Sequence, residues 1–207
     1  MAKSPRKPER PILWIVAGPN GSGKSSLYGR TDIEGWGGSV WIINPDLLTD
    51  SIVEQENLAR DPANGVALDR IEAWLYACLT VYQTIGVETV LSSFKYRRLV
   101  CTARAAGYEI RLIYVVLRNA ELQLERIRVR VLEGGHDVAE QKVRDRRLRS
   151  FRQLLWFARR ADHVLIYDNS TSEPKLTLEW SRTHGELARG RLPADLVAVA
   201  SAYRVTR

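Results

Sequence analysis

The chain has few cysteines and no long apolar segment. Its two cysteines, Cys78 and Cys101, indicate neither a disulfide framework nor a metal site, so we expect both to be buried packing residues. No run of about 18 or more apolar residues occurs, which argues against a membrane-spanning helix. The apolar run at residues 12–17 is too short for the core of a signal peptide. These absences predict a cytoplasmic protein without a membrane partner, in which residues 1–9 form a flexible basic tail.

The positive charge is concentrated in one segment. Residues 126–160 contain ten Arg and one Lys against four acidic residues, and this surplus equals the net charge of +7 of the whole chain. The planar guanidinium group suits phosphate oxygens better than the point charge of Lys does. Concentrated Arg therefore indicates either nucleic acid or a small substrate rich in phosphate, although most of these cations are expected on a solvated helix face.

Apolar runs alternate with longer segments of helical periodicity, which predicts an α/β fold with a mostly parallel sheet. We expect residues 10–207 to form a single domain with five core strands, and a largely helical C-terminal extension of about residues 171–207 with one short strand at 176–178. The expected core strands are residues 12–17, 40–43, 87–91, 108–117 and 164–167. After a helix that opens near Gly23, the expected helices are residues 66–85 with Gly86 as cap, 95–106 closed by Gly107, 120–132 and 138–160.

The sequence from Gly18 to Ser25 has the spacing G-x-x-x-x-G-K-[ST] of a phosphate-binding P-loop. It follows an apolar strand and opens a predicted helix, so backbone N–H groups and the positive helix end would surround a phosphate. Lys24 would neutralise the β- and γ-phosphates, and the Ser25 hydroxyl would bind Mg²⁺. The predicted ATP-binding residues are Gly18, Pro19, Asn20, Gly21, Ser22, Gly23, Lys24, Ser25 and Ser26.

A P-loop occurs in ATPases, GTPases and kinases, so other side chains have to distinguish among these classes. The chain has neither the Asn/Thr-Lys-x-Asp motif of guanine readers nor a Leu-Ser-Gly-Gly-Gln signature. Phosphoryl transfer to a hydroxyl needs a carboxylate for the acceptor and cations over the γ-phosphate. Asp46 ends the second predicted strand, where open α/β sheets bind ligands. It is our candidate general base and substrate-binding residue, and the alternative is a helix N-cap.

Polar residues interrupt and follow the third predicted strand. Glu88 and Thr89 lie inside this apolar run, and Ser92 follows it. A carboxylate at such a position is costly to bury without a purpose. We predict that Glu88 binds Mg²⁺ or positions the substrate together with Thr89 and Ser92. The alternative is an edge strand with Glu88 exposed to solvent.

The helix predicted over residues 120–132 carries Arg126, Arg128 and Arg130. Arg126 and Arg130 share one face because they are four residues apart. Such a helix suits a lid that brings an arginine over the γ-phosphate, where charge builds up in the transition state. Further candidates from the next helix are Arg144, Arg146 and Arg147.

Together these motifs resemble the zeta-toxin family of P-loop kinases over about residues 12–170. The resemblance is carried by the P-loop, Ile43-Asn-Pro-Asp46, Glu88-Thr-Val-Leu-Ser92, Gly107-Tyr108, Arg126-Ile-Arg-Val-Arg130, Gly134-Gly-His-Asp-Val138 and Tyr167-Asp-Asn-Ser170. It implies a kinase that uses ATP and Mg²⁺ to phosphorylate a hydroxyl of a nucleotide sugar, UDP-N-acetylglucosamine. It also implies a toxin blocked by an antitoxin protein.

Within this resemblance Asp46 corresponds to the catalytic base, Glu88 to the strand carboxylate, and Lys24 and Ser25 to the phosphate loop. Arg130 corresponds to the cationic lid, and His136 aligns with a second lid position. Two other readings stay open from the residues: a kinase of nucleic-acid ends or of another small molecule, and an ATP-dependent switch that signals to a protein partner without a phosphorylated metabolite.

Overall fold

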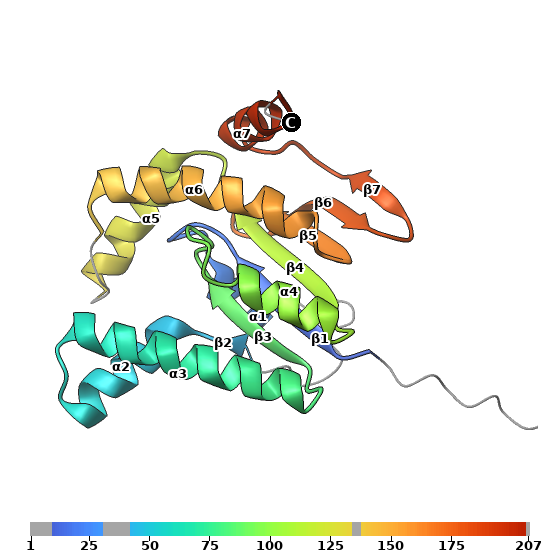
Figure 1. Ribbon diagram of the computed structural model, residues 1–207. Helices are drawn as coiled ribbons and strands as arrows, with labels where there is room; N and C mark the ends of the chain where they lie inside the picture. The colour runs from blue at the N-terminus through green and yellow to red at the C-terminus, as the bar shows by residue number, and fades with distance from the viewer. Residues whose placement is uncertain (1–9, 31–41, 134–137, 206–207) are drawn as a thin grey trace, which may run out of the picture.

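The computed structural model describes residues 10–30, 42–133 and 138–205. Its centre is one sheet with the strand order β2-β3-β1-β4-β5-β6-β7 (Figure 1). The first five strands in this order are parallel, whereas β6 and β7 are antiparallel. The prediction of five parallel core strands is therefore confirmed. The strands are β1 (Ile12–Ala17), β2 (Ile42–Ile43), β3 (Ile85–Thr89), β4 (Glu109–Val116), β5 (His163–Asp168), β6 (Lys175–Ser181) and β7 (Gly185–Ala188).

Helices cover both faces of the sheet because successive side chains of a strand point to opposite faces. In β1, Leu13 and Ile15 pack in the large core beneath α3, α4 and α6, whereas Trp14 and Val16 pack with Leu27 of α1 on the other face. The central strand is thus buried on both sides, as its continuous apolar sequence predicts. The helices are α1 (Lys24–Arg30), α2 (Pro45–Glu56), α3 (Arg60–Thr80), α4 (Arg97–Ala105), α5 (Ala120–Leu132), α6 (Glu140–Ala158) and α7 (Ala194–Val205).

The helix predicted over residues 66–85 ends earlier, at Thr80. Tyr82 has a left-handed backbone (φ 54°). Its N–H donates to the carbonyl oxygen of Leu79, and the N–H of Gln83 donates to that of Cys78. This is the Schellman pattern that usually takes glycine after the last turn. A tyrosine in that place carries no sequence signal of a helix end, so the predicted boundary is wrong.

Gly86 does not cap a helix but lies inside β3, which begins two residues before the predicted strand at 87–91. A Cβ atom at Gly86 would lie 2.2 Å from Cδ1 of Ile42 on β2. Gly86 therefore marks a close approach of neighbouring strands rather than a turn.

Gly107 closes α4, as predicted, although the helix begins at Arg97 rather than at residue 95. Gly107 has φ +88°, and its N–H donates to the carbonyl oxygen of Arg104. Cys101 on this helix is exposed, whereas Cys78 on α3 is buried. The expectation of burial is therefore wrong for Cys101.

The C-terminal extension is less helical than expected. It contains the antiparallel hairpin of β6 and β7 before α7, and all four residues of β7 are exposed. Because β7 buries no side chain, its sequence Gly-Glu-Leu-Ala has no apolar pattern from which a strand could be predicted. The predicted tail at residues 1–9 and the predicted strand residues 40–41 lie outside the described residues.

Candidate functional site

The P-loop connects β1 to α1, and its first residue must be glycine. Gly18 donates its N–H to the carbonyl oxygen of Thr89 at 3.3 Å. A Cβ atom at Gly18 would lie 2.4 Å from the carbonyl oxygen of Val115 on β4. The loop therefore leaves β1 wedged between the ends of the neighbouring strands β3 and β4. This places it at the carboxyl edge of the parallel sheet, where such folds bind ligands.

The end of the P-loop is held by Asn169, which follows β5. Its Nδ2 atom donates to the carbonyl oxygen of Ser22 at 2.8 Å. A Cβ atom at Gly23 would lie 2.2 Å from this Nδ2, and Gly23 has φ +83°. Both the backbone conformation and the close approach of Asn169 therefore require glycine here. This contact gives a physical role to Asn169, the residue directly after β5.

Lys24 is the first residue of α1 and is only 7% exposed. Its Nζ atom lies 3.4 Å from the carbonyl oxygen of Pro19 and 3.7 Å from Oε1 of Glu88. Burial lowers the pKa of Lys24, and the nearby Arg130 lowers it further, whereas the carboxylates of Glu88 and Asp46 act in the opposite direction. The structure thus brings the four predicted charged groups together.

Glu88 occupies the centre of this arrangement. It is 7% exposed and lies on β3, which has β1 on one side and β2 on the other, so the alternative of an exposed edge strand is wrong. Its Oε2 atom accepts hydrogen bonds from Oγ of Ser25 at 3.0 Å and from Nδ2 of Asn44 at 3.2 Å. The hydroxyl of Thr89 accepts a hydrogen bond from the N–H of Leu91. This bond connects the Thr89 side chain to the turn after β3.

Asp46 lies in the first turn of α2 and is exposed. Its backbone N–H donates to Oδ1 of Asn44 at 2.9 Å, so Asn44 is the N-cap of this helix. The alternative of Asp46 as N-cap is therefore wrong, and its carboxylate does not cap the helix. Asn44 was not among the predicted site residues. The Asn-Pro sequence is a usual helix start, which is the signal that could have identified it.

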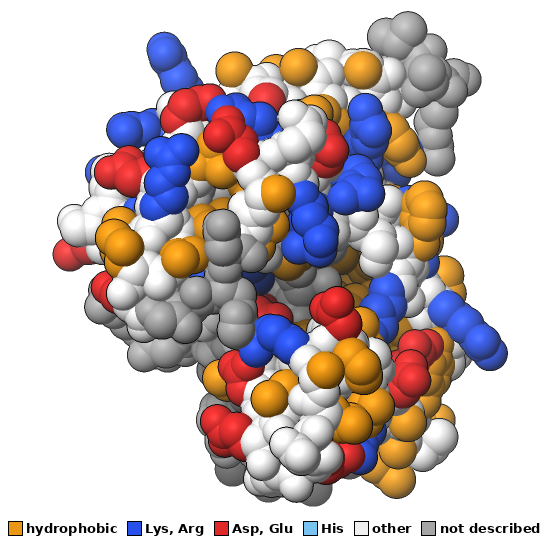
Figure 2. Space-filling model, turned by 90° about the vertical axis from the view of Figure 1, so that its left-hand side faces the viewer, with side chains coloured by type: hydrophobic (Ala, Val, Ile, Leu, Met, Phe, Trp, Pro, Cys, Tyr) orange, Lys and Arg blue, Asp and Glu red, His pale blue; other side chains and the backbone are white. Residues whose placement is uncertain are grey.

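These side chains surround a cavity of ≈ 560 Å³, within the usual size range of small-molecule sites. The molecule is hollowed between its upper and lower parts on the face that Figure 2 shows. Ser92 lines the cavity, whereas His136 lies outside the described residues. Residues that sequence reasoning missed are Asn64 and Leu68 of α3, and Lys95 and Tyr96 before α4.

Burial shifts the pKa of two of the residues that sequence reasoning missed. Burial lowers the pKa of Lys95, partly opposed by Glu72 and Asp69. Burial also raises the pKa of Tyr96 to about 12. Tyr96 therefore enters the cavity as a neutral group near neutral pH, and Lys95 as a partly buried cation.

The arginines of residues 126–160 differ in whether they reach the cavity. Arg126 and Arg130 of α5 and Arg146 of α6 line the cavity, whereas Arg128 is exposed on another face of α5. Arg144 binds Glu121 and Glu140 instead. Arg147 is buried and lies against Asp195. Of the three α6 candidates, the structure therefore brings only Arg146 to the cavity.

The site suits Mg²⁺ only together with a nucleotide. Among the described residues no group of three or more His, Cys, Asp or Glu could hold a metal ion. Ser25 and Glu88 nevertheless present two oxygen ligands 3.0 Å apart beside Lys24. Mg²⁺ commonly binds through one or two such groups, with nucleotide phosphates and water as the other ligands. The residues present therefore fit this ion.

Comparison with known proteins identifies a family and a relative of this chain. The family model AAA_33, described as an AAA domain, matches residues 13–155. An uncharacterised protein of Haemophilus influenzae (strain ATCC 51907 / DSM 11121 / KW20 / Rd) is 30% identical over 146 residues, which cover 66% of this chain and 98% of that protein. Within the described residues, none of the helices combines the length and the apolar character that a membrane span requires.

Several solved structures have a similar fold, and two of them cover nearly the whole chain. One is the AvrRxo1-ORF1:-ORF2 complex with ATP, with a TM-score of 0.64 and 14% identity over 95% of this chain and 63% of the other. The chain thus spans less than two thirds of that relative. The other is from the PezAT chromosomal toxin–antitoxin system of Streptococcus pneumoniae, with a TM-score of 0.64 and 13% identity over 98% of this chain and 88% of the other. At such identities the likeness shows a shared P-loop α/β fold.

Proposed function

The chain belongs to the AAA_33 family of AAA domains, and from this premise we propose that it is an ATP-dependent phosphotransferase. The observation that carries the proposal is one cavity lined by Lys24 and Ser25 of the P-loop, by the carboxylates Asp46 and Glu88, and by Arg130. ATP hydrolysis alone needs no room for a second substrate. Here the same cavity extends to Asn64, Ser92 and Tyr96, outside the P-loop, which supports an acceptor site.

In the proposed reaction Asp46 is the general base. The acceptor O–H bond breaks and its proton passes to the Asp46 carboxylate, while the acceptor oxygen bonds to the γ-phosphorus and the bond to the β-phosphate oxygen breaks to release ADP. Lys24 and Arg130 stabilise the charge that builds up on the transferred group. Ser25 and Glu88 would hold Mg²⁺, which when bound would neutralise charge on the phosphates.

The acceptor that we propose is the sugar hydroxyl of a nucleotide sugar, with UDP-N-acetylglucosamine as the first candidate. The proposal rests on the resemblance of the site motifs to zeta-toxin kinases. A fold shared with a protein of the PezAT toxin–antitoxin system is compatible with it. Under this proposal Thr89 and Ser92 contact the substrate, an antitoxin protein is the expected partner, and the chain acts as a toxin.

The test incubates purified protein with ATP, Mg²⁺ and UDP-N-acetylglucosamine and measures one added phosphate by mass spectrometry. The variants are Asp46→Asn and, as a matched control on the same helix, Asp50→Asn. Asp50 binds Arg60 at 2.7 Å and is not part of the cavity lining. We expect product from the wild type and from Asp50→Asn, and a rate lower by about 10²–10⁴-fold in Asp46→Asn.

Full activity of Asp46→Asn would show that another group is the base. Bound ATP without any phosphorylated sugar nucleotide would instead reject the proposed acceptor. The same assay would then be run with an oligonucleotide that carries a 5′-hydroxyl, which tests the nucleic-acid reading of the arginine-rich segment.

A further inference from the structure

We propose that Arg147 is a positioning residue, which the C-terminal helix α7 holds in place so that α5 stays seated on the P-loop. Arg147 is 1% exposed and is not part of the cavity lining. Its role would therefore be exerted through other residues. The part of this proposal that concerns reaction rate rests on the proposed phosphotransfer, whereas the coupling between α7 and α5 can be tested without it.

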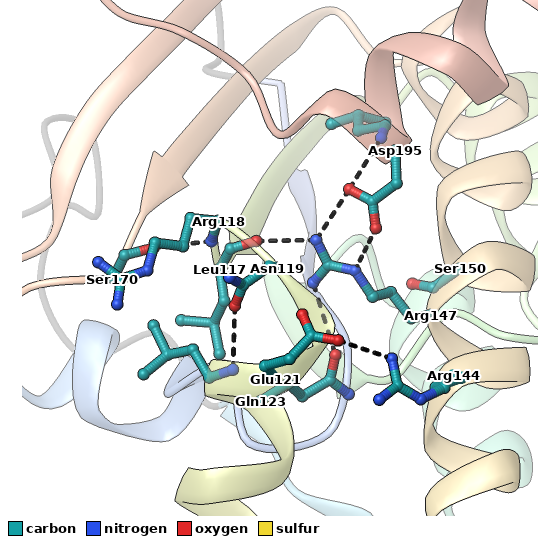
Figure 3. Close-up of polar contacts among 12 residues, drawn as sticks. Leu117, Arg118, Asn119, Glu121, Gln123, Arg144, Arg147, Ser150, Ser170 and Asp195 are labelled. Carbon is teal, nitrogen blue, oxygen red and sulfur yellow. Dashed lines mark hydrogen bonds and ion pairs between the residues drawn. The ribbon is translucent and has the colours of Figure 1, made fainter.

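The guanidinium group of Arg147 joins three elements (Figure 3). Its Nε and Nη2 atoms donate to the two carboxylate oxygens of Asp195 on α7, at 2.6 and 3.0 Å. Nη2 also donates to the carbonyl oxygen of Leu117, just after β4, at 2.8 Å. Nη1 lies 3.5 Å from Oε1 of Gln123 in α5. Arg147 thus contacts both the segment that leads into α5 and the first turns of that helix.

Helix α5 in turn packs directly on the P-loop at Gly21. A Cβ atom at Gly21 would lie 3.2 Å from the carbonyl oxygen of Gln123 and 3.1 Å from Cγ1 of Ile127. Gln123 is fully buried. One and two turns further along the same helix, Arg126 and Arg130 line the cavity. A shift of α5 would therefore move both arginines relative to the phosphate loop.

Helix α6 reaches the other side of the cavity from the same face. Ser150 follows Arg147 by three residues, so the two side chains share a helix face. The Ser150 hydroxyl donates to the carbonyl oxygen of Val90 at 2.6 Å, and Val90 lines the cavity. Helix α6 thus contacts the segment after β3 through Ser150 and the start of α5 through Arg147.

A guanidinium group stays charged in a protein, so a buried one depends on its partners. Removal of the Asp195 carboxylate would leave the charge of Arg147 without its anion and favour movement of the side chain toward water. Its contacts with Leu117 and Gln123 would then be lost. Asp195 lies more than twenty residues after the end of β5 in the chain. The contacts of Arg147 explain how a substitution in this remote segment would affect the cavity.

The experiment compares the full chain with Asp195→Asn, the conservative variant Asp195→Glu, and Arg144→Gln as a matched control. Arg144 also connects α6 to α5, through Glu121, but does so at the surface. Hydrogen exchange of residues 120–132 is measured beside that of β1 and β4. For Asp195→Asn we expect exchange in α5 to rise by about tenfold more than exchange in β1 and β4, and this excess to disappear in Asp195→Glu.

In the same samples kcat for phosphate transfer should fall by about 10²-fold in Asp195→Asn, with a smaller change in KM for ATP, because the arginines are displaced rather than removed. Wild-type exchange in α5, or an equal rise in α5, β1 and β4, would overturn the proposal. If Asp195→Asn does not fold, Gln123→Leu removes the α5 end of the contact while keeping the ion pair, and unchanged α5 exchange in that variant would also overturn it. If the wild type transfers no phosphate, the proposed function fails, and hydrogen exchange alone decides the coupling.

Discussion

Two buried cations, Lys24 at the cavity and Arg147 behind it, differ in how well the protein satisfies them. Arg147 has donor distances of 2.6 to 3.0 Å to Asp195 and 2.8 Å to Leu117. The Nζ atom of Lys24 lies 3.4 Å from a carbonyl oxygen and 3.7 Å from Glu88, both longer than good hydrogen bonds. The well-satisfied cation supports the fold, and the poorly satisfied one faces the cavity.

The carboxylate partners differ in the same sense. Asp195 presents both oxygens to one guanidinium group, which is the strong bidentate arrangement. Glu88 instead accepts hydrogen bonds from Ser25 and Asn44 as well as lying beside Lys24. Burial lowers the pKa of Lys24 and so disfavours its charged form. A phosphate in the cavity would stabilise that charged form, because phosphate is an anion. The comparison teaches that burial alone does not identify a functional cation, whereas burial with long contacts beside a cavity does.

The largest expected effect is on Lys24. Lys24→Met should lower the rate of phosphate transfer by about 10²–10³-fold, because a preorganised cation near the transferred group is lost. The free energy of unfolding should change by less than about 1 kcal/mol, because Glu88 keeps its hydrogen bonds from Ser25 and Asn44. Rate assays and urea denaturation measure both. A large loss of stability would contradict the distinction between the two cations.

The second prediction concerns the stability supplied by Asp195. Asp195→Asn should lower the free energy of unfolding by about 2 kcal/mol, because the buried charge of Arg147 loses its anion. The loss is smaller than for a fully buried pair, since the Asp195 side chain is 34% exposed. Addition of Arg147→Met to this variant should recover part of the loss, since the unpaired charge is then gone. Urea denaturation of the single and double variants measures this. A further loss in the double variant would contradict the explanation by an unpaired charge.

A smaller, pH-dependent effect is expected for Glu88→Gln. The Glu88 carboxylate raises the pKa of Lys24 against the effect of burial, so its removal lets this pKa fall further. Phosphate binding needs the protonated ammonium group, which is lost as pH rises through the pKa. In the absence of Mg²⁺, affinity for ATP should therefore begin to fall at a lower pH in Glu88→Gln than in the wild type. Titration calorimetry across alkaline pH measures the shift, and an unchanged or higher midpoint would oppose it.

The smallest effect is expected at the surface of α6. Arg144→Gln removes ion pairs with Glu121 and Glu140, whose side chains are 66% and 53% exposed. Exposed pairs of this kind contribute little, so the free energy of unfolding should be nearly unchanged. Urea denaturation beside Asp195→Asn gives the direct contrast. An equal loss in both variants would mean that burial does not distinguish the two arginines.

Much of this molecule could be predicted from local sequence patterns. The bounds of α5 agree with the predicted residues 120–132, because an N-cap asparagine and a regular apolar face mark them. The P-loop and the strand before it were equally clear. The end of α3 was not, because Tyr82 adopts a conformation that sequence rules reserve for glycine. Strand β7 was missed because it buries nothing.

The candidate site was predictable in part, for a related reason. Glu88 was identified because a carboxylate inside an apolar strand is unusual, and the structure places it beside Lys24. Lys95 and Tyr96 were missed, although they line the same cavity. The sequence predicts both residues inside a helix over 95–106, whereas α4 begins at Arg97 and leaves them in the connection after β3. Only the packing of that connection against α3 and α6 brings them to the cavity.

The sequence by itself determined the phosphate loop and the α/β class, because both depend on short-range spacing: glycines within one turn, and apolar residues within one strand or helix. Tertiary structure alone decided which of the clustered arginines lie at the cavity. Arg146 and Arg147 are neighbours in the chain, yet one lines the cavity and the other binds Asp195. Adjacent residues of a helix point in directions about 100° apart, so the packing of α6 against α5 and α7 decides which of them faces the cavity.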